Sequence, residues 1–182
     1  MTWIGLDWDY VTGDCSAECN DHCSRTRCPY RRAYGARQAH IWRGGAVPTE
    51  GWDKRLAQVE RMLRRVTLTG QVVFRDSHAD IVDFLVPGDH VLHIDDHLDS
   101  YPDSRLYCGS WREYADVTGV TSVHVRPPAV KRGEYSLFVC LSRPYTSPAL
   151  DGALLRVLCD IRHPIDFLGW GSSKGVEATD GG

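Results

Sequence analysis

The sequence lacks a long hydrophobic run, and this absence limits the classes of protein to which the chain can belong. No apolar stretch in its 182 residues approaches the roughly 20 residues that a membrane-spanning helix requires. The segment from Met1 to Asp7 also lacks the basic start and apolar stretch that mark a secretory signal. We therefore expect a cytoplasmic protein without a membrane partner.

Clustered positive charge is missing as well. The formal net charge is -3, and the adjacent basic residues are isolated pairs at Arg31–Arg32, Arg64–Arg65 and Lys131–Arg132. Binding to a phosphate backbone needs a concentrated basic surface. Nucleic acid is therefore not expected as a partner.

The composition that is present is ordinary for a globular protein, with 42% hydrophobic and 25% charged residues. The length suits one well-buried domain, which we expect over residues 1–168. A polar, Cys-rich insertion is expected at 14–45, and the Gly/Ser-rich stretch 169–182 is expected to be a flexible tail. No internal repeat is visible.

Short apolar strands alternate with amphipathic helices along the chain, which predicts a single three-layer α/β domain with a mainly parallel sheet. The expected strands are Trp3–Leu6, Val72–Phe74, Val91–Ile94, Ser122–Val125 and Leu137–Leu141, and the expected helices are Trp52–Arg65, Ala79–Leu85, Glu113–Val117 and Ala149–Ile161.

The segment that follows Val91–Ile94 carries the strongest chemical signal. Alternate residues of an extended backbone share a face, so Asp95, His97 and Asp99 are predicted to project to the same side. They follow an apolar strand at its carboxyl end, where open α/β sheets place their ligand sites. Alone, such a triplet could be the end of a strand that enters a polar loop.

Two further strands end in the same manner. Asp7 and Asp9 follow one strand, and His78 follows another. An isolated Asp-x-Asp is commonly a turn or a helix cap, and a lone histidine is usually an ordinary polar residue. Together, however, these carboxylates cannot stay ionised and partly buried without a compensating cation.

The set of ligands favours oxygen-loving metal ions. Carboxylates mixed with imidazoles suit Mn²⁺ or a related divalent ion, whereas a structural zinc site favours Cys and His. The set exceeds the needs of one ion and fits two ions about 3.5–4 Å apart. The predicted metal ligands are Asp7, Asp9, His78, Asp95, His97 and Asp99.

This arrangement resembles the ureohydrolase superfamily, which contains the arginases and agmatinases. The resemblance implies two Mn²⁺ ions bridged by Asp95 and Asp7. It assigns His78 and Asp99 to one ion, and His97 and Asp9 to the other. It also implies that Asp99 relays a proton during catalysis, and that the stretch after Cys108, namely Gly109, Ser110 and Trp111, is a substrate-binding loop.

The chain departs from the larger members of that superfamily. Its acidic pair precedes the triplet, so the fold is expected to be circularly permuted, and Arg112 stands where a proton-shuttling histidine would fall. Order and size most resemble the small peptide arginases, which convert arginine side chains of ribosomally made precursor peptides to ornithine. A precursor peptide is therefore the expected partner, with Trp111 and Tyr145 as candidates to flank its backbone or to belong to the core.

Of the seven cysteines, Cys108, Cys140 and Cys159 are scattered and form one group, and the other four are clustered. Cys140 and Cys159 lie in apolar surroundings and are interpreted as core residues. The second group lies in the polar insertion, where its first three members recur every four residues and the fourth lies close by. It is either a Zn²⁺ site or a set of free thiols beside the active site. That second group consists of Cys15, Cys19, Cys23 and Cys28.

Three functions remain open from the sequence. The leading hypothesis is a Mn²⁺-dependent hydrolase that cleaves the guanidino group of arginine side chains in a peptide. One alternative is a metal-dependent amide deacetylase on a related scaffold, although no tandem histidine pair is present. The other is a metal- or peptide-binding module without turnover. The sequence does not decide whether the chain forms a homo-oligomer.

Overall fold

A five-stranded sheet forms the centre of the molecule, in which every pair of neighbouring strands is parallel. The computed structural model describes residues 1–12, 52–75, 77–95, 98–100, 102, 106–141 and 148–160. The strand order is β2-β5-β1-β3-β4, so the first strand of the chain is the central one. The strands are β1 (Thr2–Asp7), β2 (Thr67–Arg75), β3 (His90–Ile94), β4 (Thr121–His124) and β5 (Glu134–Cys140).

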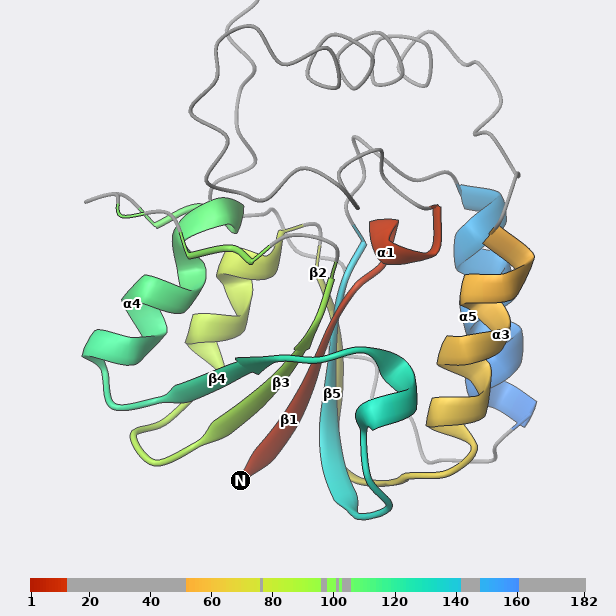
Figure 1. Cartoon of the computed structure of the whole chain (residues 1–182), viewed down its shortest axis with the longest axis horizontal. Helices are drawn as coiled ribbons and strands as arrows, with labels where there is room; N and C mark the ends of the chain where they lie inside the picture. The colour runs from red at the N-terminus through yellow and green to blue at the C-terminus, as the bar shows by residue number, and fades with distance from the viewer. Residues whose placement is uncertain are drawn as a thin grey trace, which may run out of the picture.

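Helices cover both faces of the sheet, which gives three layers (Figure 1). Helices α3 (Trp52–Leu63) and α5 (Pro148–Asp160) lie on one face. Helix α4 (Trp111–Val117) and the 3-10 helix η2 (His78–Asp83) lie on the other. The predicted α/β domain with a parallel sheet is confirmed. The remaining short elements are α1 (Asp9–Thr12), η3 (Cys108–Ser110) and η4 (Pro127–Ala129).

The alternation of side chains along β1 explains the two apolar layers. Ile4 and Leu6 are fully buried in the core on the α3/α5 face. Trp3 points to the opposite face, where it joins the core under α4 and η2. Gly5 and Asp7 follow Trp3 at intervals of two residues, so they belong to this second face. The α4/η2 face is thus apolar in its lower part and polar where β1 ends.

The largest differences from the predicted elements are the start of β2 and the type of the helix that follows it. Strand β2 begins at Thr67 rather than Val72, because Thr67 and Leu68 also pair with β5 before the register shifts between Leu68 and Val72. The segment predicted as an α-helix over Ala79–Leu85 is the 3-10 helix η2. Its start is fixed by the side chain of Ser77, which accepts a hydrogen bond from the backbone of Ala79 at 3.2 Å.

The strand predicted at Val91–Ile94 is confirmed as β3, which spans His90–Ile94. The extended backbone expected to align Asp95 and Asp99 does not reach Asp99, whose φ of 52° lies in the left-handed region that aspartate tolerates better than most residues. The alternation of side chains along the strand therefore does not determine where Asp99 points. Cys159 also differs from its prediction as a core residue, because it is exposed on α5.

Among the described residues, no helix is both long and apolar enough to cross a membrane.

Candidate metal centre

The carboxyl ends of the three central strands bring polar side chains together on the α4/η2 face. Asp7 ends β1 and is paired in register with Cys140, the last residue of β5. His93 lies one residue before the end of β3, and Asp95 follows that strand. All four are buried, with exposed fractions of 3% or less. The parallel topology therefore collects oxygen, nitrogen and sulfur donors at one edge of the sheet.

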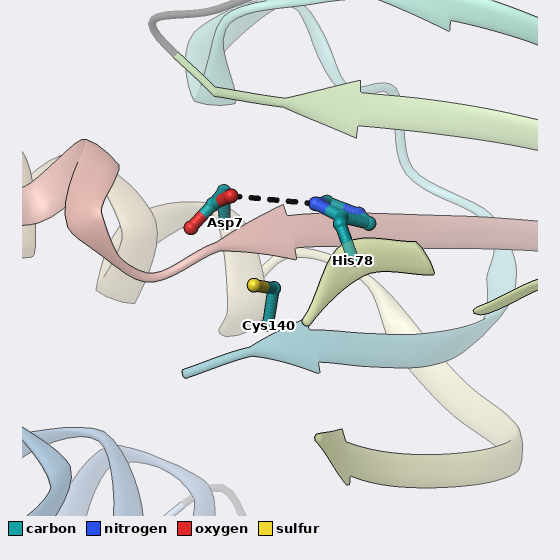
Figure 2. A group of neighbouring side chains, drawn as sticks. All are labelled: Asp7, His78 and Cys140. Atoms are coloured by element: carbon teal, nitrogen blue, oxygen red, sulfur yellow. Dashed lines mark ion pairs between the residues drawn. The ribbon is translucent and has the colours of Figure 1, made fainter. Parts of the chain in front are cut away.

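Contacts with an acidic side chain, an indole ring and a glycine position the imidazole of His78 beside β1. Its Nδ1 lies 3.5 Å from Oδ2 of Asp7. A dashed line marks this ion pair in Figure 2. The ring stacks on the indole of Trp111, with centroids 4.9 Å apart and an interplanar angle of 9°. On the sheet side, a Cβ on Gly5 would lie 2.9 Å from His78 Nε2. Only glycine leaves room for the imidazole at this point of β1.

His93 lies between two carboxylates. Its Nε2 is 3.5 Å from Oδ2 of Asp95 and 3.5 Å from Oδ2 of Asp99. Burial opposes charge on the ring, but the two carboxylates outweigh that effect and raise the pKa of His93 to about 9. A divalent cation bound to this nitrogen would have to displace the proton.

Asp99 reaches the site through the turn after β3. Its Oδ2 accepts a hydrogen bond of 3.1 Å from Trp111 Nε1, and its carbonyl oxygen accepts one of 3.2 Å from the backbone N–H of Arg112. Burial and the negative charge of Asp95 raise the pKa of Asp99, although the nearby imidazoles oppose this. A left-handed backbone and a crowded carboxylate are features that proteins retain where a ligand needs them.

The turn itself is anchored to β4 and to the segment that follows it. His124 Nε2 lies 2.8 Å from the carbonyl oxygen of Asp95, and Arg126 Nη1 donates to the same oxygen at 3.1 Å. Arg112 donates to the carbonyl oxygen of Leu98 at 2.7 Å and to the hydroxyl of Ser122 at 2.9 Å. Arg112, which stands where the resemblance places a shuttling histidine, therefore supports the loop that carries Asp99.

Both imidazoles are fully buried, and none of their four ring nitrogens has a hydrogen bond to another described residue. Buried polar atoms are normally hydrogen-bonded, because desolvation without a partner costs about 1–3 kcal/mol in proteins. His78, His93 and Asp99 can each bring a ligand atom within 4.8 Å of the other two. The donor chemistry and the unsatisfied nitrogens fit a bound divalent cation.

The structure brings four of the predicted metal ligands into one site, namely Asp7, His78, Asp95 and Asp99. His97 and the side chain of Asp9 lie outside the described residues, although the backbone of Asp9 begins α1. The predicted cysteine cluster at Cys15, Cys19, Cys23 and Cys28 lies outside them as well. The count of two ions therefore stays a prediction.

The predicted substrate loop lies directly beside the site. Gly109 and Ser110 belong to η3, and the Ser110 hydroxyl accepts a hydrogen bond from the backbone of Tyr107 at 3.1 Å. Ser110 is buried, and Trp111 has no exposed surface. Trp111 therefore supports Asp99 and His78 from within the core. Tyr145, the other predicted contact for a peptide, lies outside the described residues.

Sequence reasoning missed three donors at this site. His93 precedes Asp95 by two residues, so the period of two that grouped the later residues would also have included it. Cys140 was interpreted as a core residue, and only the register between β1 and β5 places it beside Asp7. Cys108 accepts a hydrogen bond from the backbone N–H of His78 at 3.4 Å, a contact that no local pattern predicts.

Comparisons with protein-family models, with curated proteins and with solved structures gave no match to this chain. The chemistry of the site is therefore inferred from its own residues.

Proposed function

We propose that this protein is a divalent-metal hydrolase with its active site at the carboxyl end of β1 and β3. The observation that carries the proposal is the pair of buried imidazoles, His78 and His93, whose ring nitrogens have no hydrogen bond among the described residues. They face Asp7, Asp95 and Asp99 at ion-pair distances of 3.5–4.0 Å. A cation would satisfy the imidazoles and neutralise the carboxylates at once.

The sequence motifs support a more specific activity. We infer that the substrate is an arginine side chain in a peptide, with two Mn²⁺ ions as the cofactor. Ions of this kind supply Lewis acidity and a water molecule of lowered pKa. Addition of water to the guanidinium carbon and cleavage of its bond to Nε would yield urea and an ornithine side chain.

Asp99 is the residue that we assign to proton transfer. Trp111 Nε1 donates a hydrogen bond to Oδ2 of its carboxylate, and His93 Nε2 lies 3.5 Å from the same oxygen. In this position Asp99 would accept a proton from the attacking water and return it to the leaving amine. The neighbouring carboxylate, Asp95, would remain a metal ligand.

The preference for a peptide rests on the resemblance to the small peptide arginases, which act on arginine side chains carried on a peptide backbone. The expected partner is a precursor peptide that contains arginine.

Urea release tests the proposal directly. Mn²⁺-loaded protein is incubated with arginine, agmatine and an arginine-containing peptide, with the Asp95→Asn variant as a control. We expect urea from the peptide, at a higher kcat/KM than from arginine, and only background release by the variant. A higher kcat/KM for free arginine would contradict the peptide preference.

The same preparations discriminate between the alternatives. Release of acetate from an acetyl-lysine peptide without urea would indicate an amide deacetylase. Bound metal without turnover of either peptide would indicate a metal- or peptide-binding module. All these functions assume a bound metal ion, and metal analysis of the reconstituted protein tests that assumption. A metal content near zero would exclude all metal-dependent activities.

A further inference from the structure

Two thiols lie among the oxygen and nitrogen donors of the site, and the proposed Mn²⁺ chemistry has no use for them. Cys140 ends β5 and is fully buried on the α4/η2 face. Cys108 begins η3 and interacts with Cys140 through its side chain. Neither cysteine is in a disulfide. Thiolates are soft ligands that Mn²⁺ does not select and that Zn²⁺ and related ions do.

The first group of donors consists of Asp7, His78 and Cys140 (Figure 2). Each offers one ligand atom, and these atoms lie within 4.8 Å of one another. Ligands at about 2.0–2.3 Å from a tetrahedral zinc ion are about 3.3–3.8 Å apart, so a modest contraction of the group would complete the site. The parallel pairing of Asp7 with Cys140 already fixes their backbones as neighbours.

The imidazole gives an independent indication of a ligand. His78 is fully buried, its Nδ1 points to Asp7, and its Nε2 faces the backbone at Gly5. Neither nitrogen has a hydrogen bond to any described residue. Nδ1 therefore lies on the side of the carboxylate and the Cys140 thiol, where it would present its lone pair to a bound ion.

A second group of donors shares Asp7 with the first. Asp7, Asp99 and Cys108 also place their ligand atoms within 4.8 Å of one another. The backbone N–H of His78 donates a hydrogen bond of 3.4 Å to Cys108 Sγ, which holds this sulfur beside the group. Each of the two groups thus contains one thiol, and Asp7 can bridge them.

We propose that Cys140 and Cys108 are metal ligands, so that this centre holds a thiophilic divalent ion such as Zn²⁺ in the position bounded by Asp7, His78 and Cys140. The inference rests on the proposed metal centre and changes the ion at this position from Mn²⁺ to a thiophilic one. On binding, each thiol forms a metal–sulfur bond and releases its proton to solvent. No change of oxidation state is involved.

Electronic absorption of the Co²⁺-loaded protein tests the inference, because only sulfur ligands give an intense near-ultraviolet charge-transfer band. The full chain is compared with Cys140→Ser, Cys108→Ser and Cys159→Ser at equal protein concentration under reducing conditions. Cys159 is exposed on α5 and serves as the matched control. Any band from the cysteine cluster in the polar insertion is common to all samples and cancels in the differences.

We expect the band to weaken in Cys140→Ser and in Cys108→Ser, and to stay unchanged in Cys159→Ser. Zn²⁺ affinity of Cys140→Ser should fall by more than about 100-fold, because loss of an outer-shell partner alone costs about 10–100-fold. An unchanged band in a Cys140→Ser protein with the circular dichroism of the original chain would overturn the inference.

Cadmium NMR on the unaltered chain covers the case in which the variants fail to fold. The chemical shift separates cadmium with one or two sulfur ligands from cadmium with none, and from the thiolate-rich site that the cysteine cluster would give. Urea release without a resonance of the mixed type would overturn the thiolate inference and leave the proposed hydrolase intact. A mixed resonance without urea release would support the thiolate ligands and overturn the proposed cleavage of arginine.

Discussion

Buried carboxylates have opposite environments at the two ends of the sheet. At the amino end, Asp89 is 2% exposed and is surrounded by donors. Its oxygens accept hydrogen bonds from the amino group of Met1 at 2.6 Å, from the backbone N–H of Val86 at 3.1 Å and from Trp3 Nε1 at 3.3 Å. At the carboxyl end, Asp95 and Asp99 face each other's negative charge and a buried imidazole.

The polar groups at the amino end stabilise the fold, whereas those at the carboxyl end are suited to binding a ligand. A buried carboxylate with its own donors holds the segment before β3 against the start of β1. At the carboxyl end, the buried carboxylates and the imidazoles without hydrogen bonds lower the free energy of unfolding as long as no cation is bound. The amino end should therefore lose stability on substitution, whereas the carboxyl end should lose function.

The largest expected effect is the loss of metal from the carboxyl end. Asp95→Ala should reduce the content of both ions to background, whereas Asp9→Ala should chiefly empty one position, because Asp95 is assigned as a bridge between the ions and Asp9 is not. Saturating metal at 100 times its Kd should stabilise the original chain by about 2.7 kcal/mol. Metal analysis and urea unfolding with and without a chelator measure both quantities. Equal metal loss in the two variants would contradict the assignment.

Asp89→Asn should destabilise the amino end by about 1.5–3 kcal/mol, the usual contribution of hydrogen bonds to a charged group. The exposed Asp116→Asn is the control and should change stability by less than about 0.5 kcal/mol. Urea unfolding at neutral pH measures the difference. A loss for Asp89→Asn no larger than that of the control would show that the donors around Asp89 add nothing to the fold.

The stability difference between the original chain and Asp89→Asn should depend on pH. Burial raises the pKa of Asp89, but the amino terminus and the hydrogen bonds of Val86 and Trp3 outweigh it, and the net pKa is lowered. A carboxylate with a lowered folded pKa stabilises the protein fully above its unfolded pKa of about 3.9. The advantage over Asp89→Asn should therefore be constant near neutral pH and disappear as the pH falls through the folded pKa.

Gly5→Ala tests how closely the fold accommodates His78. The added Cβ would lie 2.9 Å from His78 Nε2 and 3.1 Å from Val91 Cγ1, so the imidazole must move. We expect a loss of about 1–3 kcal/mol and weaker metal binding. Gly152→Ala in α5 is the matched control, because its Cβ would meet Arg156 Nη1 at an ordinary 3.5 Å. That change should stabilise the helix by about 0.5–1 kcal/mol. Unaltered metal affinity in Gly5→Ala would show that His78 is not a ligand.

The smallest expected effect is a gain in stability rather than a loss. Asp99→Asn keeps the acceptor for Trp111 Nε1 and a residue type that tolerates a φ of 52°, but removes one negative charge beside Asp95. In the presence of a chelator we expect a gain of about 0.5–2 kcal/mol in unfolding free energy, as at other sites where function opposes stability. Metal affinity should fall. A destabilised Asp99→Asn would mean that the carboxylate supports the fold in the manner of Asp89.

The sequence predicted the architecture because local patterns determine it. The apolar strands at Trp3–Leu6 and Val91–Ile94 and the amphipathic stretch from Trp52 are recognisable from periodicity alone, since burial on one face selects the residues. It also predicted that Asp7, His78, Asp95 and Asp99 would meet, because parallel strands present their carboxyl ends at one edge. Metal, substrate and activity remain predictions.

Only the tertiary structure decided how the site is completed. Cys140 lies beside Asp7 because β5 inserts between β2 and β1, and no pattern in the chain specifies that order of strands. Asp99 reaches His93 through a left-handed turn rather than along an extended strand. Trp111 supports the acid and the imidazole from a helix that begins later in the chain. Local sequence fixes which residues a strand buries, whereas contacts between distant segments depend on how the whole sheet is assembled.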